Sequence, residues 1–468
     1  MQPPCFASPA PGQAAWKAEP AGTAGQAIAK PALSWDETRM GSAKDGRMGL
    51  WMTGALVVGT MIGAGIFMLP VSLAPLGRNA VAGWAVSSAG ALAIAFALAR
   101  LSRLGGEGIQ ANIEAQLGPI PAFLTAWAFW VSNWVAQAAT AIAGASALSW
   151  VNPAFSGPGF VIPVALAAVV ALTAVNAAGA RASGGMSLLT VAVKLLPLIG
   201  VVVALALRSG APRPLEPLGP APFTLPNLGS AVALTFFALT GFENATTPVD
   251  KVRDPARTLP RAILGGTLFV AFLYLVSSTG VQLLLPAGLA AASPAPYADV
   301  IAAAWGGPLA TAAALCVAVA AFGCLNGLIL ATGELGYAMG LRRDLPAFMA
   351  WTRGAGTPVG AQIAGAALSI LLILANSSRA TNSLFAFIIL LSTAAVLVVY
   401  TAGAVAAWRL DSSPAARAVV VVALLFILFA VYGSGMEADL WCLALLAVGL
   451  ALRAAMRGLG RVPAAGGA

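Results

Sequence analysis

The chain has 468 residues, of which 59% are hydrophobic and only 9% are charged, and its mean hydropathy is +0.88. A soluble domain carries about 25% charged residues, so this composition predicts a polytopic membrane protein. The sequence contains no histidine, which excludes a His-ligated metal site and a His-based catalytic triad. Its four cysteines are scattered without metal-ligand spacing, so we expect free thiols, no metal site and no cofactor. The net charge of +9 does not indicate nucleic acid binding, because the basic residues are spread over short loops, where they set membrane topology.

The first 47 residues are rich in Pro, Ala and Gly and show no apolar periodicity, which predicts a disordered cytoplasmic tail over 1–47. We expect a transport core of ten membrane helices over 48–408, two additional membrane helices over 409–456 and a short cytoplasmic tail over 457–468. Most of the predicted spans are close to the roughly 20 residues that a bilayer requires. The third and eighth are too long for one straight crossing, so we expect them to tilt or to extend into the cytoplasm. The twelve spans are 49–73, 80–102, 119–151, 158–180, 185–207, 227–249, 259–285, 297–336, 358–376, 382–408, 415–433 and 438–454.

The basic residues predict the orientation of these spans. With the N-terminus inside, twenty of the 25 Lys and Arg residues fall on the cytoplasmic side and Lys194 lies within a span. The four that fall outside are Arg78, Arg208, Arg213 and Arg379. Because cytoplasmic loops carry the excess of Lys and Arg, this bias predicts that both termini are cytoplasmic.

Two of the apolar spans are interrupted at matching places. The first contains Gly63-Ala64-Gly65, and the sixth contains a polar stretch from Thr240 to Glu243. Each interrupted span begins a set of five, and five helices reverse the topology of the set that follows. The pattern therefore predicts the 5+5 inverted repeat of secondary transporters, whose substrate site lies at such breaks near the bilayer midplane.

The backbone of the two breaks predicts the chemistry of a ligand. Unpaired backbone groups are costly in hydrocarbon, so an unwound stretch must line a cavity. Residues 63–65 offer N–H groups at a half-helix N-terminus, which suits a carboxylate. Residues 237–240 offer carbonyl groups at a half-helix C-terminus, which suits an ammonium group. The pair matches an α-amino acid. Glycines of this kind in isolation more often mark close helix packing, and the matching break favours the functional reading.

Two ionisable side chains lie at membrane depth. Glu243 could be a protonated acid that hydrogen-bonds two helices, but its place beside a break favours a proton-binding group whose charge changes during transport. Lys194 lies too far from a helix end to reach the interface easily. We expect it to pair with an acid or a backbone carbonyl, or to be neutral through burial.

The third span carries two stripes of side chains at helical spacing. One stripe could form an interfacial belt or line a pocket, although its spacing more often means packing; it consists of Trp127, Trp130 and Trp134. The other is polar and fits hydrogen bonding between helices as well as it fits ligand binding; it consists of Ser132, Asn133, Gln137 and Thr140.

Together these residues resemble the amino acid/polyamine/organocation (APC) superfamily, within which the chain is most similar to the bacterial basic amino acid/polyamine antiporters of the arginine/agmatine type. The resemblance covers about 49–455. The matching stretches are Gly63–Pro70, Gly241–Asn244, Arg253–Pro260, Gly356–Val359 and Gly433–Gly435. It implies an all-α LeuT-type fold of twelve transmembrane helices, in which the first and sixth are broken.

The resemblance also implies roles for individual residues. At the first break, the substrate carboxylate would bind to the backbone amides of Ala64, Gly65 and Ile66. Gly63 belongs to the same binding segment. The ammonium group would lie at the carbonyls of Met61, Phe237 and Thr240. The expected side-chain pocket consists of Ser132, Asn133, Gln137, Thr140 and Leu328. Phe129 and Phe237 would act as gates, Glu243 matches a proton-sensing acid, and Lys194 resembles the fifth-helix lysine of proton-coupled permeases.

The chain departs from the arginine/agmatine group where selectivity is decided. Phe237 and Leu328 replace tryptophans that stack on a cationic substrate, and cation–π attraction is weaker over Phe and absent over Leu. Our first reading is therefore a proton-linked permease or antiporter of the bacterial inner membrane for a neutral amino acid. An arginine/agmatine-type exchanger is the alternative. A sensor or scaffold would need a large soluble partner domain, and an enzyme is the weakest reading. The expected partners are an amino acid, protons and the lipid bilayer, with a homodimer as an open alternative and no nucleic acid.

Overall fold

The computed structural model describes residues 48–102, 109–152, 158–179, 183–209, 215–243, 252–354, 356–410 and 413–459. All of these residues belong to the second of the chain's two units, residues 47–468. The tail predicted over 1–47 and the residues from 460 onward lie outside the described residues. The same holds for 244–251, which include the end of the predicted sixth span.

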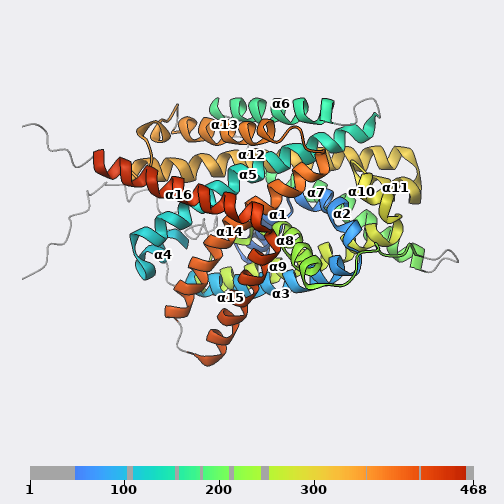
Figure 1. The fold of residues 1–468 in the computed structure, drawn as a ribbon, viewed down its shortest axis with the longest axis horizontal. Coiled ribbons are helices and arrows are strands. Elements are labelled where there is room, and N and C mark those ends of the chain that lie inside the picture. The colour runs from blue at the N-terminus through green and yellow to red at the C-terminus, as the bar shows by residue number, and fades with distance from the viewer. Residues whose placement is uncertain are drawn as a thin grey trace, which may run out of the picture. The chain divides into compact units, whose positions relative to one another are not determined.

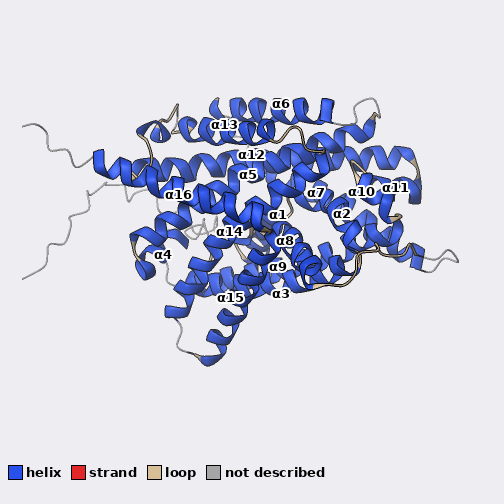
Figure 2. Cartoon of the chain, viewed as in Figure 1, coloured by secondary structure: helices blue, strands red, loops and turns tan. Residues whose placement is uncertain are grey.

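The described part of the chain is helical and contains no strand, only two isolated β-bridges (Figure 2). This confirms the predicted all-α class. The helices are α1 (Leu50–Met61), α2 (Gly65–Leu73), η3 (Ala74–Leu76), α3 (Arg78–Leu101), α4 (Ile109–Leu117), α5 (Pro119–Val151), α6 (Pro158–Ala177), α7 (Ser183–Ser209), α8 (Leu225–Leu239), α9 (Pro255–Leu284), α10 (Ala287–Ala292), α11 (Pro296–Trp305), α12 (Gly307–Leu341), η8 (Ala347–Ala350), α13 (Val359–Ala375), α14 (Thr381–Leu410), α15 (Pro414–Ser434) and α16 (Met436–Leu459).

Eight of the described helices are long and apolar enough to cross a membrane. The pair formed by α1 and α2 makes a ninth candidate span, bent by 48° at its break. Two further apolar helices, α8 and α13, are shorter. For α8 the reason is visible, because the helix ends at Leu239, where the sequence predicted the second break.

The prediction of one long span over 297–336 is wrong. The structure divides this stretch into α11 and α12, which meet at Gly306. Gly306 has a φ of +92°, a conformation that residues with a Cβ rarely adopt, and Pro308 lies in the first turn of the new helix. The high hydropathy on both sides of this Gly-Gly-Pro sequence concealed the boundary.

Packing places the two breaks in the middle of the bundle (Figure 1). Helix α5 packs mainly against α12 and α14, while α6 and α13 lie side by side on the outer face of α5 and α12. Helix α3 packs against α8, α9 and α15, and α1 packs against α9 and α7. Helix α2 packs against α5, α8 and α14, and α8 also packs against α14.

Candidate functional site

A cavity of about 90 Å³ lies at the two breaks, between α1, α2, α5, α8, α12 and α14. This volume is well above the roughly 10–15 Å³ that a cavity needs to hold one water molecule. All the predicted site residues line it except Gln137 and Lys194; those that do are Met61, Gly63, Ala64, Gly65, Ile66, Phe129, Ser132, Asn133, Thr140, Phe237, Thr240, Glu243 and Leu328. The structure thus brings them together, and their binding roles remain predictions.

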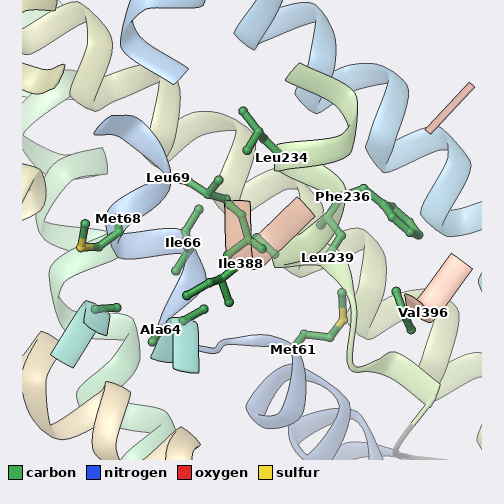
Figure 3. Close-up of a cluster of buried hydrophobic side chains, with 14 of the residues drawn as sticks. Met61, Ala64, Ile66, Met68, Leu69, Leu234, Phe236, Leu239, Ile388 and Val396 are labelled. Atoms are coloured by element: carbon green, nitrogen blue, oxygen red, sulfur yellow. The ribbon is translucent and has the colours of Figure 1, made fainter. Parts of the chain in front are cut away.

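The first break supplies backbone donors. Helix α1 ends at Met61, whose carbonyl oxygen accepts a hydrogen bond of 2.8 Å from the N–H of Gly63. Helix α2 begins at Gly65, and the N–H groups of a first helical turn have no acceptor within the helix. Figure 3 shows Met61 and Ala64 on either side of this break, with Ile66 on the first turn of α2. The positive end of the α2 dipole and its free N–H groups make this end of the cavity suitable for an anion.

The second break lies against the first. After α8, Thr240 is extended and Gly241 has a φ of +108°. A Cβ atom at residue 241 would lie 2.8 Å from the carbonyl oxygen of Thr60 and 3.3 Å from the Cα of Met61. Only glycine allows both the backbone conformation and this close approach, so Gly241 holds the two breaks together.

The ring of Phe237 covers the start of α2. A Cβ atom at Gly65 would lie 2.7 Å from the Phe237 ring, so the ring rests directly against the glycine backbone. Phe237 belongs to α8 and Gly65 to α2, and the ring therefore bridges the two broken spans. This position suits a gate over the anion end of the cavity, which is the role that the resemblance predicts.

Two of the three carbonyl groups expected to receive an ammonium group, those of Met61 and Phe237, already have donors. The Met61 oxygen accepts from Gly63 and, at 3.1 Å, from the hydroxyl of Tyr274. The Phe237 oxygen accepts from the N–H of Thr240 at 3.3 Å and from its hydroxyl at 2.7 Å. A carbonyl oxygen has two lone pairs, so an ammonium group must displace one donor at each site. The sequence could not show this, because both donors depend on the local fold.

Glu243 is buried with 5% of its surface exposed and is the one acid among the residues that line the cavity. Its Oε2 accepts hydrogen bonds from the N–H of Gly241 at 3.0 Å and from the hydroxyl of Tyr400 at 2.7 Å. Tyr400 comes from α14, and its ring stacks on that of Phe242 at 5.4 Å. The acid thus connects the break after α8 to α14. Tyr400 could not be recognised from the sequence, because it lies within a long apolar span where tyrosine carries no signal of its own.

Part of the polar stripe of α5 lines the cavity, and part of it joins α5 to a neighbouring helix. Ser132 and Ser392 of α14 are joined by reciprocal hydrogen bonds, with 3.0 Å between their hydroxyl oxygens, and both line the cavity. Asn133 donates to the carbonyl of Phe129 at 2.7 Å. Gln137 instead donates to Thr332 at 2.7 Å and does not line the cavity. The prediction that Gln137 lines the pocket is therefore not supported, because its amide joins α5 to α12.

The tryptophan stripe of α5 serves packing, as its spacing indicates. Trp127 donates to the carbonyl of Leu445 in α16, and Trp130 donates to the carbonyl of Thr332 in α12. The two rings stack on each other at 5.2 Å.

Lys194 lies outside the cavity but reaches the first break from behind. Its side chain is 7% exposed, and its Nζ donates to the carbonyl of Gly59, in the last turn of α1, at 3.2 Å. The sequence left either an acid or a backbone carbonyl as the partner of Lys194, and in the structure the partner is the backbone carbonyl of Gly59. An ammonium group at the C-terminal end of a helix is also favoured by the helix dipole.

Seven further residues line the cavity without having been predicted as site residues: Thr60, Ala136, Ala238, Gly241, Cys324, Ser392 and Val396. Ser392 and Val396 lie on α14, and Cys324 lies on α12 with its sulfur 3.4 Å from the position of a Cβ at Gly63. Cys324 is a free thiol that borders the cavity. Within the described ranges, no three His, Cys, Asp or Glu side chains come together to hold a metal ion.

Comparison with known proteins identifies the class to which this fold and cavity belong. Residues 48–467 match the family model for amino acid permeases. The chain therefore belongs to the amino acid permease family of the APC superfamily, and it is a multi-pass membrane transporter rather than an enzyme.

Individual relatives agree with this family. The chain is 32% identical over 266 residues to the putrescine transporter PotE of Escherichia coli (strain K12), covering 55% of this chain and 60% of the relative. It is 27% identical over 425 residues to PotE of Haemophilus influenzae, covering 86% of this chain and 94% of the relative. It is 36% identical over 313 residues to an uncharacterized transporter of Mycobacterium tuberculosis (strain ATCC 25618 / H37Rv), covering 65% and 68%. The match to the Escherichia coli protein spans less than two thirds of that relative's length.

Proposed function

We propose that this chain is a secondary active transporter of the bacterial inner membrane that carries a small neutral amino acid by alternating access. The observation that carries the proposal is the cavity at the two breaks, which has backbone donors at one end and uncharged side chains over most of its wall. The start of α2 receives the carboxylate. The carbonyls of Met61 and Phe237 receive the ammonium group after displacing one of their present donors.

The remaining wall favours a neutral side chain. It is formed by Phe129, Ala136, Leu328 and Val396, together with hydroxyl and amide groups that already have partners. Only Glu243 is acidic, and its Oε2 is engaged by Gly241 and Tyr400. A second cationic group on the substrate would have to be buried without a dedicated partner, which is unfavourable.

A polyamine is the second candidate. Two of the relatives are described as putrescine transporters, and Glu243 lies at the edge of the cavity, where it could face an ammonium group. A four-carbon diamine is also no larger than a small amino acid, so the cavity volume does not separate the two. An arginine/agmatine-type substrate is longer. The cavity also has Phe237 and Leu328 at the two positions where the resemblance associates tryptophans with such a substrate.

A competition experiment in proteoliposomes separates these substrates. Counterflow of radiolabelled alanine or leucine should be inhibited by unlabelled alanine, leucine and methionine, and weakly by putrescine, arginine and agmatine. The methyl ester of leucine is the matched control, because it keeps the side chain and ammonium group but removes the carboxylate. We expect the ester to lose competition. Inhibition by putrescine alone, or equal inhibition by leucine and its ester, would contradict the amino acid proposal and indicate an amine as the substrate.

We further propose that protons drive transport through Glu243 and that both termini face the cytoplasm. The first proposal rests on the burial of Glu243 between the second break and α14, and the second rests on the bias of basic residues. A C-terminal fusion to green fluorescent protein should fluoresce, while a fusion to alkaline phosphatase at the same point should be inactive. The reverse pattern would overturn the orientation. A homodimer stays a prediction, which mass photometry of the purified protein would test.

A further inference from the structure

A second cavity lies away from the transport site, at the C-terminal ends of α7 and α9 and along α11. Its volume is about 190 Å³, and it shares no residue with the cavity at the breaks. Its walls include Ala204, Leu207 and Arg208 of α7, Leu284 of α9, and Val300 and Trp305 of α11. No role in the transport proposal accounts for it.

Arg208 is the one charged residue among those that line this cavity. Its Nε atom is buried and has no hydrogen-bond partner, and the guanidinium makes no ion pair with any acid in the described ranges. A buried donor of a charged group is costly when it is left unpaired. The planar guanidinium matches the oxygen atoms of a phosphate or carboxylate, so a bound anion would supply the acceptor that the Arg208 Nε donor lacks.

The surroundings of the cavity face the hydrocarbon of the membrane. Along α7, Leu196, Ile199, Val203 and Leu207 are between 42% and 64% exposed, which marks a lipid-facing stripe that leads to Arg208. Arg208 occupies the last turn of α7, and Trp305, 38% exposed, ends α11 on the opposite wall. Arginine and tryptophan at helix ends mark the membrane–water interface. The cavity therefore joins an apolar groove to a single cation at the level of the lipid headgroups.

We propose that this cavity binds an anionic phospholipid, with the phosphate on Arg208 and an acyl chain between Leu207, Leu284 and Val300. A soluble anion would account for the arginine but leave the apolar walls exposed. An uncharged lipid tail would fill the walls but leave the guanidinium unpaired. The basic-residue distribution assigns Arg208 to the outside, so the lipid comes from the outer leaflet of the inner membrane.

The position of the cavity connects it to the moving parts of a transporter. Helix α7 carries Lys194, which holds the last turn of α1, and α11 packs against both α2 and α7. A lipid seated between α7, α9 and α11 would therefore hold together the elements that flank both halves of the first broken span. We expect occupancy to change the transport rate, because it favours one arrangement of these helices over another.

Native mass spectrometry of the purified full-length protein tests the binding directly, with phosphatidylglycerol and phosphatidylcholine as probes. Wild type should retain phosphatidylglycerol in preference. Arg208→Gln should reduce that retention about tenfold or more, as expected for loss of a charge-assisted contact. Arg78→Gln is the matched control, because Arg78 is an exposed arginine on the same predicted side and does not line the cavity. It should bind lipid like wild type.

A second variant keeps the proposal falsifiable if the loss of charge has wider effects. Ala304→Phe places a ring in the cavity and leaves Arg208 intact, so it should also reduce phosphatidylglycerol retention. Equal retention by wild type and both cavity variants would overturn the proposal, as would full displacement of the lipid by inorganic phosphate. The readout does not depend on the transported solute, so failure of the lipid site and failure of the transport proposal are distinguishable.

Discussion

The two breaks in the membrane helices present opposite kinds of chemistry. The break between α1 and α2 is built from Gly63, Ala64 and Gly65 and offers N–H groups without a titratable side chain. The break after α8 contains Glu243, whose carboxylate is held by Gly241 and by Tyr400 of α14. The first can bind an anion at any pH, whereas the second can change its charge. Substrate recognition and coupling to protons are thereby separated between two segments that touch at Gly241 and Thr60.

The largest effect is expected where the two breaks meet. Gly241→Ala introduces a side chain at a φ of +108° and places its Cβ 2.8 Å from the carbonyl oxygen of Thr60. The backbone strain alone costs about 1–3 kcal/mol. We expect transport to fall about a hundredfold or more and the melting temperature of the purified protein to fall as well.

The matched control for this variant is Gly327→Ala, at an exposed glycine of α12 whose added Cβ would meet no atom within 4 Å. It should transport and melt like wild type. If Gly241→Ala also transports normally, the two breaks do not need their close contact and act independently.

The next effect concerns the break that carries a charge. Glu243→Gln keeps the shape of the protonated acid but cannot release a proton. A single titrating group changes a rate by up to about tenfold per pH unit, and the variant should remove that dependence from uptake in proteoliposomes. Glu437→Gln is the control, because Glu437 is an exposed acid paired with Arg379. Retained pH dependence with normal transport would show that another group couples the proton.

Much of this comparison could be predicted from the sequence, since an acid at membrane depth is unusual enough to mark a site and the two spans are interrupted at matching places. Polar residues that also serve as helix contacts could not be sorted in the same way. With about 100° per residue, Asn133 and Thr140 lie within about 20° of each other on α5, whereas Gln137 lies about 40° to 60° further round. That difference turns Gln137 towards Thr332 of α12, and only the placement of α12 reveals it.

Residues that come from distant helices were the other part that the sequence could not supply. Tyr400 and Ser392 are separated from Glu243 and Ser132 by more than 150 residues, and both lie in an uninterrupted apolar span. A single sequence gives no information on which face of that span meets the breaks.

An intermediate effect is expected at the back of the first break. Lys194→Gln removes the charge that donates to the Gly59 carbonyl from α7. A hydrogen bond to a charged group contributes about 1.5–3 kcal/mol, so transport should fall about tenfold or more. The double variant with Glu243→Gln shows whether the breaks are coupled. Independent sites give additive losses, and a shortfall from additivity indicates one cooperative unit.

The smallest effect is expected at Phe237, the ring that bridges the breaks, and it bears on what the cavity selects. Phe237→Trp strengthens cation–π attraction by about 0.5–1 kcal/mol, so competition by putrescine should improve about two- to fivefold. The larger ring also presses further on Gly65, where a Cβ would already lie 2.7 Å from Phe237, and competition by leucine should weaken. Phe129→Trp changes the other gate position in the same cavity without contacting Gly65 and should shift the two solutes less. If putrescine and leucine lose affinity equally in Phe237→Trp, the ring at this position affects the volume of the cavity and not the choice between the two solutes. Opposite shifts would show that this single position sets the preference between a neutral and a cationic substrate.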